Sequence, residues 1–183
     1  MPSPLIYPIA AVDPRAFADA TARLAGSVAI VSWERAGRAE GLLASTVSLL
    51  STRPPRVLFG VEKGSPDHAA LLEAESCAIN LLSDTDEEEA ERFTREELSA
   101  ERFSPSRWRL QTGKPPRFPA SAAHLAGVID QRIDAGSHAL FVVRVDEVDA
   151  RDRSPLVYFD HAFRRLQPPR QGSGAQVCAV WEA

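Results

Sequence analysis

One short segment carries five hydroxyl side chains within eight residues, directly ahead of a proline pair. These hydroxyls belong to Ser45, Thr46, Ser48, Ser51 and Thr52. Hydroxyl groups and backbone N–H groups at the end of a strand can hydrogen-bond the polar edge of a planar heterocycle or a polyhydroxylated chain. The small side chains of Ala44 and Ser45 would let such a ligand approach the backbone closely. The segment is therefore a candidate ligand site.

A second polar group follows at Lys63-Gly64-Ser65. It supplies an ammonium group, a permissive glycine and a hydroxyl, just before a helix opened by Ser65-Pro66-Asp67, whose first N–H groups favour anions. This combination suits a phosphate. Lys63 is one of only two lysines in the chain, the other being Lys114. A structural explanation stays open, in which the hydroxyls serve a turn and Ser65 caps the helix; Ser65 can also do both.

Composition narrows the class of protein. The 183 residues are 44% hydrophobic, which is enough for one sizeable core in a single domain. The net charge of −4 argues against nucleic-acid binding, which usually requires a basic excess. No apolar run approaches the roughly 20 residues of a membrane span, and the N-terminus does not have the pattern of a signal peptide. Cys77 and Cys178 stand far apart, so we expect a reduced, cytoplasmic protein.

Several common catalytic motifs are absent. The sequence has no glycine-rich dinucleotide fingerprint after a strand, no Walker loop, and no HExxH or GxSxG motif. The four histidines, His68, His124, His138 and His161, lack the spacing of a metal site, so no metal is expected. A contact of His161 with a nucleotide phosphate stays open, because Arg164 and Arg165 follow it closely.

The elements that position these residues follow from the hydrophobic pattern. Asp13-Pro14 predicts a helix start, with Phe17, Ala20, Thr21 and Leu24 as an inward stripe. Further helices are expected from Pro66 to Leu72 and over 84–93, and a long loop over 102–121. Strands are predicted over 27–33, 42–50, 56–62, 77–82, 124–135, 138–150 and 155–159. Their sequential order predicts a mainly β fold, an antiparallel β-barrel with peripheral helices.

Five segments, in the right order, resemble the flavin reductase-like family, the small reductase components of two-component monooxygenases. They are "GLLASTVSLLSTRPPRVLFGVEKGS", "CAINLLS", "ERF" followed by Trp108, "AGSHALFVVRVDEV" and "PLVYFDHAFRRL". The resemblance covers 17–166 and implies an FMN-binding split barrel of Greek-key antiparallel topology. It divides the chain into a domain over 1–166 and a C-terminal tail over 167–183.

The resemblance also implies roles for individual residues. Ala44, Ser45, Thr46 and Val47 would contact the isoalloxazine edge and ribityl chain of FMN or FAD. Ser51, Lys63 and Ser65 would hold the phosphate, and Asn80 would help to line the pocket. Tyr158 and Phe163 would shape its rim. His138 would act as the catalytic residue, facing the nicotinamide of NADH or NADPH.

The function implied is an NAD(P)H-dependent flavin reductase, a homodimer that supplies reduced flavin to a partner monooxygenase. Two departures from the family pattern bear on this. Ser137 replaces an aspartate before His138, and Phe163 lacks the hydroxyl of a tyrosine. Two alternatives therefore stay open. The chain could hold FMN tightly and run a different redox reaction on the same fold, or it could be a non-catalytic flavin-binding module.

Overall fold

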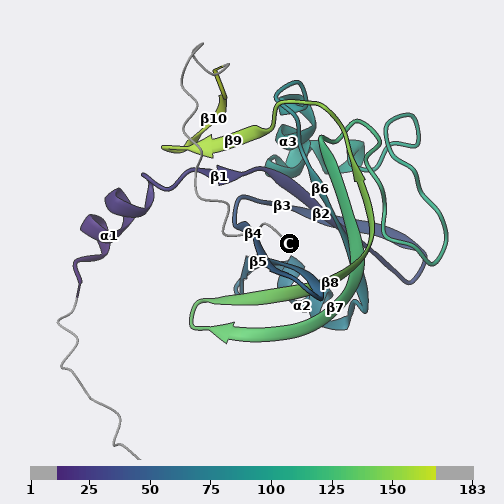
Figure 1. Ribbon diagram of the computed structural model, residues 1–183, viewed down its shortest axis with the longest axis horizontal. Helices are drawn as coiled ribbons and strands as arrows, with labels where there is room; N and C mark the ends of the chain where they lie inside the picture. Colours follow the sequence, from purple (N-terminus) through teal and green to yellow (C-terminus); the bar gives the residue numbers. More distant parts are fainter. Residues whose placement is uncertain (1–11, 168–183) are drawn as a thin grey trace, which may run out of the picture.

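The computed structural model describes residues 12–167, whose strands form two antiparallel sheets (Figure 1). The strands are β1 (Gly26–Ser27), β2 (Ala29–Arg35), β3 (Arg38–Ala44), β4 (Val47–Thr52), β5 (Pro55–Glu62), β6 (Ser76–Leu81), β7 (Ala123–Ala135), β8 (His138–Ala150), β9 (Leu156–Phe159) and β10 (Ala162–Arg165). The helices are α1 (Pro14–Thr21), α2 (Pro66–Glu73), α3 (Glu87–Thr94) and the 3-10 helix η1 (Glu96–Glu101). The expected mainly β, antiparallel fold is confirmed.

Seven strands form the barrel, in the order β3-β2-β6-β7-β8-β5-β4, and the smaller sheet has the order β1-β9-β10. β3 and β4 follow one another in the chain but stand at opposite edges of the seven-stranded sheet. The chain therefore crosses from one edge to the other between Ala44 and Val47. A hydrogen bond from the Gly60 N–H to the Thr46 carbonyl, 3.2 Å long, ties this crossing to β5.

This crossing corrects the single strand predicted over 42–50. The apolar residues on either side of Ser45 and Thr46 belong to two different strands, and both hydroxyl residues are exposed. The segment contains no glycine or proline between Leu42 and Leu50, so its sequence carries no clear sign of the break. The break matters because it presents Ser45 and Thr46 at the rim of the barrel.

Successive side chains of β2 point to opposite faces of the sheet, and each face packs in its own hydrophobic cluster. Ala29, Val31 and Trp33 face the barrel interior, where they pack in one cluster with Phe59 and Phe141 among others. Residues on the opposite face, with Ile30 as the β2 member, pack in a second cluster that includes Phe93 of α3 and Trp108 of the long loop. The long loop over 102–121 is confirmed, since it contains neither helix nor named strand.

α1 forms where its cap predicts, but its expected inward stripe is wrong. The Asp13 carboxylate accepts the Ala16 N–H at 3.0 Å, as an N-cap should. No residue of α1 is buried, and Phe17 and Leu24 are 61% and 72% exposed. The helix projects away from the barrel (Figure 1), because periodicity predicts an apolar face but not which surface will meet it.

Two further expectations concern membrane spans and the C-terminal tail. Within residues 12–167, no helix has the length and apolarity needed to cross a membrane. The predicted tail over 167–183 lies outside the described residues, apart from Gln167.

Candidate functional site

The crossing between β3 and β4 forms one wall of an open cavity of about 570 Å³. Ser45, Thr46 and Val47 line it from the barrel side, and Tyr158 lines it from β9. Ala44, the last residue of β3, lies just behind and is 4% exposed. The structure therefore brings Ser45, Thr46, Val47 and Tyr158 together.

Gly26 allows the smaller sheet to approach this wall. A Cβ atom added to Gly26 would collide with the carbonyl oxygen of Ser45. Gly26 pairs with Tyr158, so the close contact also sets where Tyr158 stands relative to Ser45. The predicted rim residue Phe163 packs edge-on against Tyr158, with ring centroids 6.0 Å apart.

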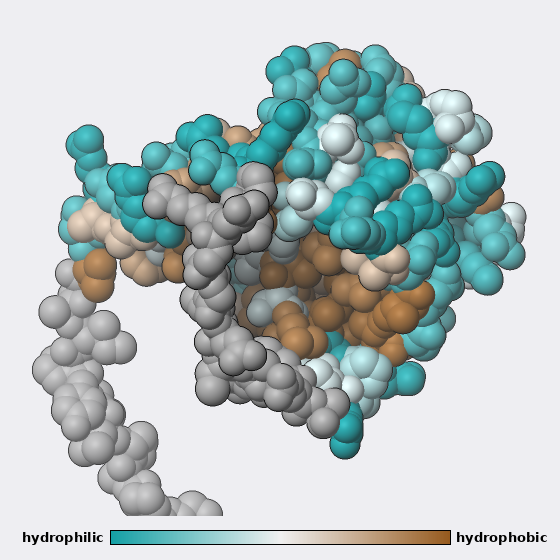
Figure 2. Space-filling model, turned by 45° about the horizontal axis from the view of Figure 1, so that its top comes forward, coloured by the Kyte–Doolittle hydropathy of each residue, from teal (hydrophilic) through white to brown (hydrophobic). Residues whose placement is uncertain are grey.

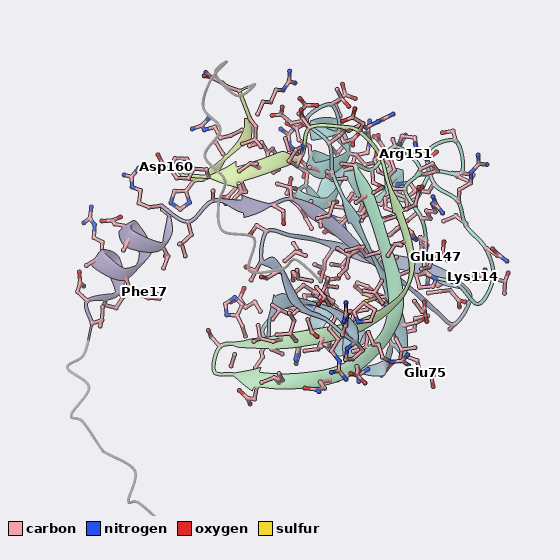
Figure 3. The ribbon with its side chains drawn as sticks, in the orientation of Figure 1. Phe17, Glu75, Lys114, Glu147, Arg151 and Asp160 are labelled. Atoms are coloured by element: carbon pink, nitrogen blue, oxygen red, sulfur yellow. The ribbon has the colours of Figure 1, made fainter. Side chains whose placement is uncertain are left out.

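The turn between β9 and β10 forms the outer wall of the cavity. Asp160 and His161 both have a positive φ, 50° and 62°, a conformation that non-glycine residues adopt only at some cost. The turn is tied to the chain after α1, because the Asp160 N–H donates to the Ala22 carbonyl and its carboxylate lies 3.6 Å from the Arg23 guanidinium. Phe17 on α1 and Asp160 lie on the same side of the molecule (Figure 3).

Strand register brings the phosphate candidates to the same end of the barrel. The Thr46 carbonyl accepts the Gly60 N–H of β5. Lys63 comes directly after the last residue of β5, Glu62, and therefore lies about 10 Å beyond Gly60 along the strand direction. Glu62 pairs with His138, and the Lys63 N–H donates to the Ser137 carbonyl at 3.0 Å. Thr46, Lys63 and His138 thus belong to one rim.

Ser65 is the N-cap of α2 and also stands beside Lys63. Its Oγ accepts the His68 N–H at 3.3 Å, which leaves its own O–H able to donate to a ligand. A Cβ atom added to Gly64 would meet nothing within 4 Å, so the space above Gly64 is open. An ammonium and a hydroxyl beside open space at the start of a helix are donors that can hold a phosphate.

The ammonium of Lys63 is engaged by a carboxylate. Lys63 Nζ lies 2.6 Å from Oδ1 of Asp134, near the end of β7. The hydrogen bond from Lys63, followed by one from the Gly136 N–H, lowers the pKa of Asp134 below its ordinary value. Asp134 therefore carries its negative charge beside the phosphate candidates. It was not among the residues predicted from sequence, because no local pattern relates it to Lys63.

The catalytic candidate His138 is exposed at the start of β8. Its Nδ1 lies 2.9 Å from the hydroxyl oxygen of Ser137, the residue that replaces the family's aspartate. A hydroxyl can orient the ring through this contact, but it adds no charge to it.

Two predicted residues do not join this rim. Ser51 pairs with Arg56, which lies about 23 Å along β5 from Lys63. Ser51 instead lines an apolar groove of about 500 Å³ with Leu49, Val145 and Val148. Within one chain, Ser51 is therefore not placed to share a phosphate with Lys63. The sequence alone does not show that β4 runs away from the rim, and a phosphate contact of Ser51 stays a prediction.

Asn80 is the second such residue, since it is fully buried and is not among the residues that line the cavity. Its Nδ2 donates to the Ile30 carbonyl and the Ser32 hydroxyl, each at 3.1 Å. Its Oδ1 accepts the Phe118 N–H at 2.9 Å and lies 3.0 Å from His124 Nδ1. All of its hydrogen-bonding groups are used inside the protein. Asn80 holds the long loop against β6 and β7.

Burial lowers the pKa of His124, and the nearby Arg117 guanidinium lowers it further. His124 therefore stays neutral in the folded protein near neutral pH. Within the described residues, no group of three or more histidine, cysteine, aspartate or glutamate side chains is arranged to hold a metal.

Comparison with known proteins agrees with these observations. The family model described as "Flavin reductase like domain" matches residues 21–167. FMN reductase (NADH) RutF 1 of Methylorubrum extorquens is 30% identical over 165 residues, which cover 88% of this chain and 82% of that protein. The reductase component of 4-hydroxyphenylacetate 3-monooxygenase from Pseudomonas aeruginosa is 26% identical over 167 residues, covering 88% and 98%.

A solved structure supports the same relationship. The flavin reductase domain protein of Arthrobacter sp. FB24 superimposes with a TM-score of 0.79 at 28% identity, covering 87% of this chain and 99% of that one. The split-barrel expectation is therefore confirmed together with the antiparallel topology. The family model spans well over half of the chain. The chain belongs to the flavin reductase-like family and is an oxidoreductase.

Proposed function

We propose that this protein reduces FMN with NADH at the rim formed by Thr46, Lys63 and His138. The observation that carries the proposal is the strand register, which gathers a polar crossing, a phosphate-type donor set and a histidine at one end of the barrel. FMN offers the matching groups, namely a planar ring, a polyhydroxylated chain and a phosphate. FMN and NADH are also the pair in the name of the Methylorubrum relative.

Different residues of the rim would bind different parts of FMN. Ser45 and Thr46 would bind the ring edge and the ribityl chain through hydroxyl and backbone groups, beside Ala44 and Val47. Lys63 and Ser65 would hold the phosphate through charge-assisted hydrogen bonds. Tyr158 would close one side of the site.

Bound FMN would supply a hydride acceptor, so the chain needs no nucleophile of its own. The protein would contribute mainly orientation, because holding two rings in contact makes the transfer effectively unimolecular. His138, kept in place by Ser137, would contact the nicotinamide and help to position it. FAD and NADPH remain to be compared as alternative substrates in the same assay.

A homodimer forms part of the proposal. Hydrophobic surface gathers in a hollow of the molecule (Figure 2), and the groove beside β4 exposes Leu49 at 43% and Val148 at 68%. Contiguous apolar surface of this kind is typical of interaction sites. A second copy covering the groove would bury it, and Ser51 would then lie at the interface.

A monooxygenase that accepts reduced flavin is the proposed partner. The Pseudomonas relative is named as the reductase component of such an enzyme. The open form of the cavity and the exposure of Ser45 and Thr46 would let flavin leave after reduction.

Steady-state oxidation of NADH and NADPH, with FMN, FAD or riboflavin added to purified protein, tests the proposal. Lys63→Ala should raise the KM for FMN, and His138→Ala should lower turnover with NADH. Lys114→Ala is the matched control, because Lys114 is the other lysine of the chain and is exposed on the long loop. Tight flavin binding without turnover by any pair would favour a different redox reaction or a non-catalytic module.

A further inference from the structure

The position of Asp134 bears on how tightly a phosphate can be held at the rim. Lys63 is the cation of the phosphate candidates, and its Nζ lies 2.6 Å from Asp134 Oδ1. The Asp134 side chain is 76% exposed and the Lys63 side chain 33% exposed. A phosphate that reaches Lys63 must therefore come close to a carboxylate that is already there.

The hairpin between β7 and β8 holds the carboxylate in place. The same oxygen of Asp134 accepts the Gly136 N–H at 2.9 Å. The next residue, Ser137, accepts the Lys63 N–H through its carbonyl, so backbone hydrogen bonds connect the two segments. The Gly136 N–H therefore gives the Asp134 carboxylate a second hydrogen-bond partner beside Lys63.

We propose that Asp134 sets the affinity of this site for phosphorylated flavin by competing with the flavin phosphate for Lys63. This inference rests on the proposed function. A phosphate ester carries between one and two negative charges near neutral pH, so it would be repelled by Asp134 and attracted by Lys63. An exposed ion pair contributes little stability, so a phosphate can displace Asp134, but only at reduced affinity.

The competition has a functional consequence. A reductase that hands its reduced flavin to another protein must release that flavin in each cycle. Asp134 would weaken the hold on the phosphate while leaving the ring and ribityl contacts at Ser45 and Thr46 unchanged. The charge of Asp134 thus acts on the charged end of the ligand, and an uncharged flavin is not affected.

The opposite role for Asp134 makes the opposite prediction. If Asp134 instead positioned Lys63 for the phosphate, removing its charge would weaken FMN binding. Asp134→Asn distinguishes the competing role from the positioning role. The substitution removes the charge, while the amide oxygen can still accept the Gly136 N–H and preserve the β7–β8 turn. Asp130→Asn is the matched control, since Asp130 lies on the same strand and pairs with Arg56, far from Lys63.

The test is to measure the Kd of FMN and of riboflavin from the quenching of flavin fluorescence. Asp134→Asn should bind FMN about tenfold more tightly, the effect of one nearby unit charge acting through partly screened solvent. It should bind riboflavin as the unsubstituted protein does, and Asp130→Asn should change neither Kd. In the Lys63→Ala background, Asp134→Asn should give a smaller gain in FMN affinity, because only the direct repulsion between Asp134 and the phosphate is then removed.

Each other outcome has a definite meaning. Weaker FMN binding by Asp134→Asn, an equal gain for riboflavin, or an equal gain in Asp130→Asn would overturn the competition. Unchanged FMN affinity would overturn it as well. If the unsubstituted protein bound neither flavin, the proposed function would fail and this inference with it.

Discussion

Replacing Asn80 with alanine should destabilise the fold by about 4 kcal/mol. The substitution removes the acceptor of the buried Phe118 N–H and the hydrogen-bond partner of His124 Nδ1. Each buried polar group left without a partner costs about 1–3 kcal/mol, so two such groups cost about 2–6 kcal/mol. The Ser32 hydroxyl keeps a second partner, the Pro116 carbonyl at 2.6 Å, and adds little to this sum.

Urea unfolding of the purified protein measures this cost. With a slope of about 2 kcal/mol per molar urea, Asn80→Ala should lower the unfolding midpoint by about 2 M. Ser76→Ala, at the other end of the same strand, serves as a control that should shift it little. The affinity for FMN at low urea should not change, because Asn80 is fully buried. An unchanged midpoint with a loss of FMN affinity would show that Asn80 contacts the ligand, which would refute this assignment.

Two further predictions follow from burial and from exposed apolar surface. His124 has a pKa below its unfolded value of about 6.5, so its contribution to stability is complete above that pH and is lost as pH falls toward the folded pKa. The urea midpoint should therefore fall between about pH 7.5 and pH 5.5, and less so in His124→Gln; an equal fall in both would contradict the assignment. Val148→Asp in the apolar groove should convert the proposed homodimer to a monomer in sedimentation experiments, whereas Leu110→Asp, on the exposed long loop, should not. A monomeric unsubstituted protein would remove the dimer proposal.

Much of the architecture could be predicted because alternation and capping are local properties. The strand over 138–150 and the caps at Asp13 and Ser65 lie where the sequence predicts them. The polar crossing was identified as a ligand site from its hydroxyls alone, although its backbone was expected to be a continuous strand. A site that depends on residue type within one segment is therefore visible in the sequence.

The site residues that the sequence could not place depend on contacts between segments far apart in the chain. The family resemblance predicts that Ser51 holds the phosphate with Lys63, but the register of β4 and β5 places Ser51 at the other end of the barrel. Asn80 was assigned to the pocket because its motif resembles the family, yet its partners come from β2, β7 and the long loop. Asp134 has no local signal, since its role arises only when the β7–β8 hairpin meets the end of β5.

Anaerobic mixing of NADH with FMN and the purified protein tests the central claim most directly. The account predicts that the visible absorbance of oxidised FMN falls in step with the nicotinamide absorbance of NADH, at a rate proportional to protein concentration. His138→Ala should slow this step, and Lys63→Ala should require more FMN to reach the same rate. If FMN stays oxidised in the presence of NADH and a correctly folded protein, the chain does not transfer hydride between them, and the proposed function is contradicted.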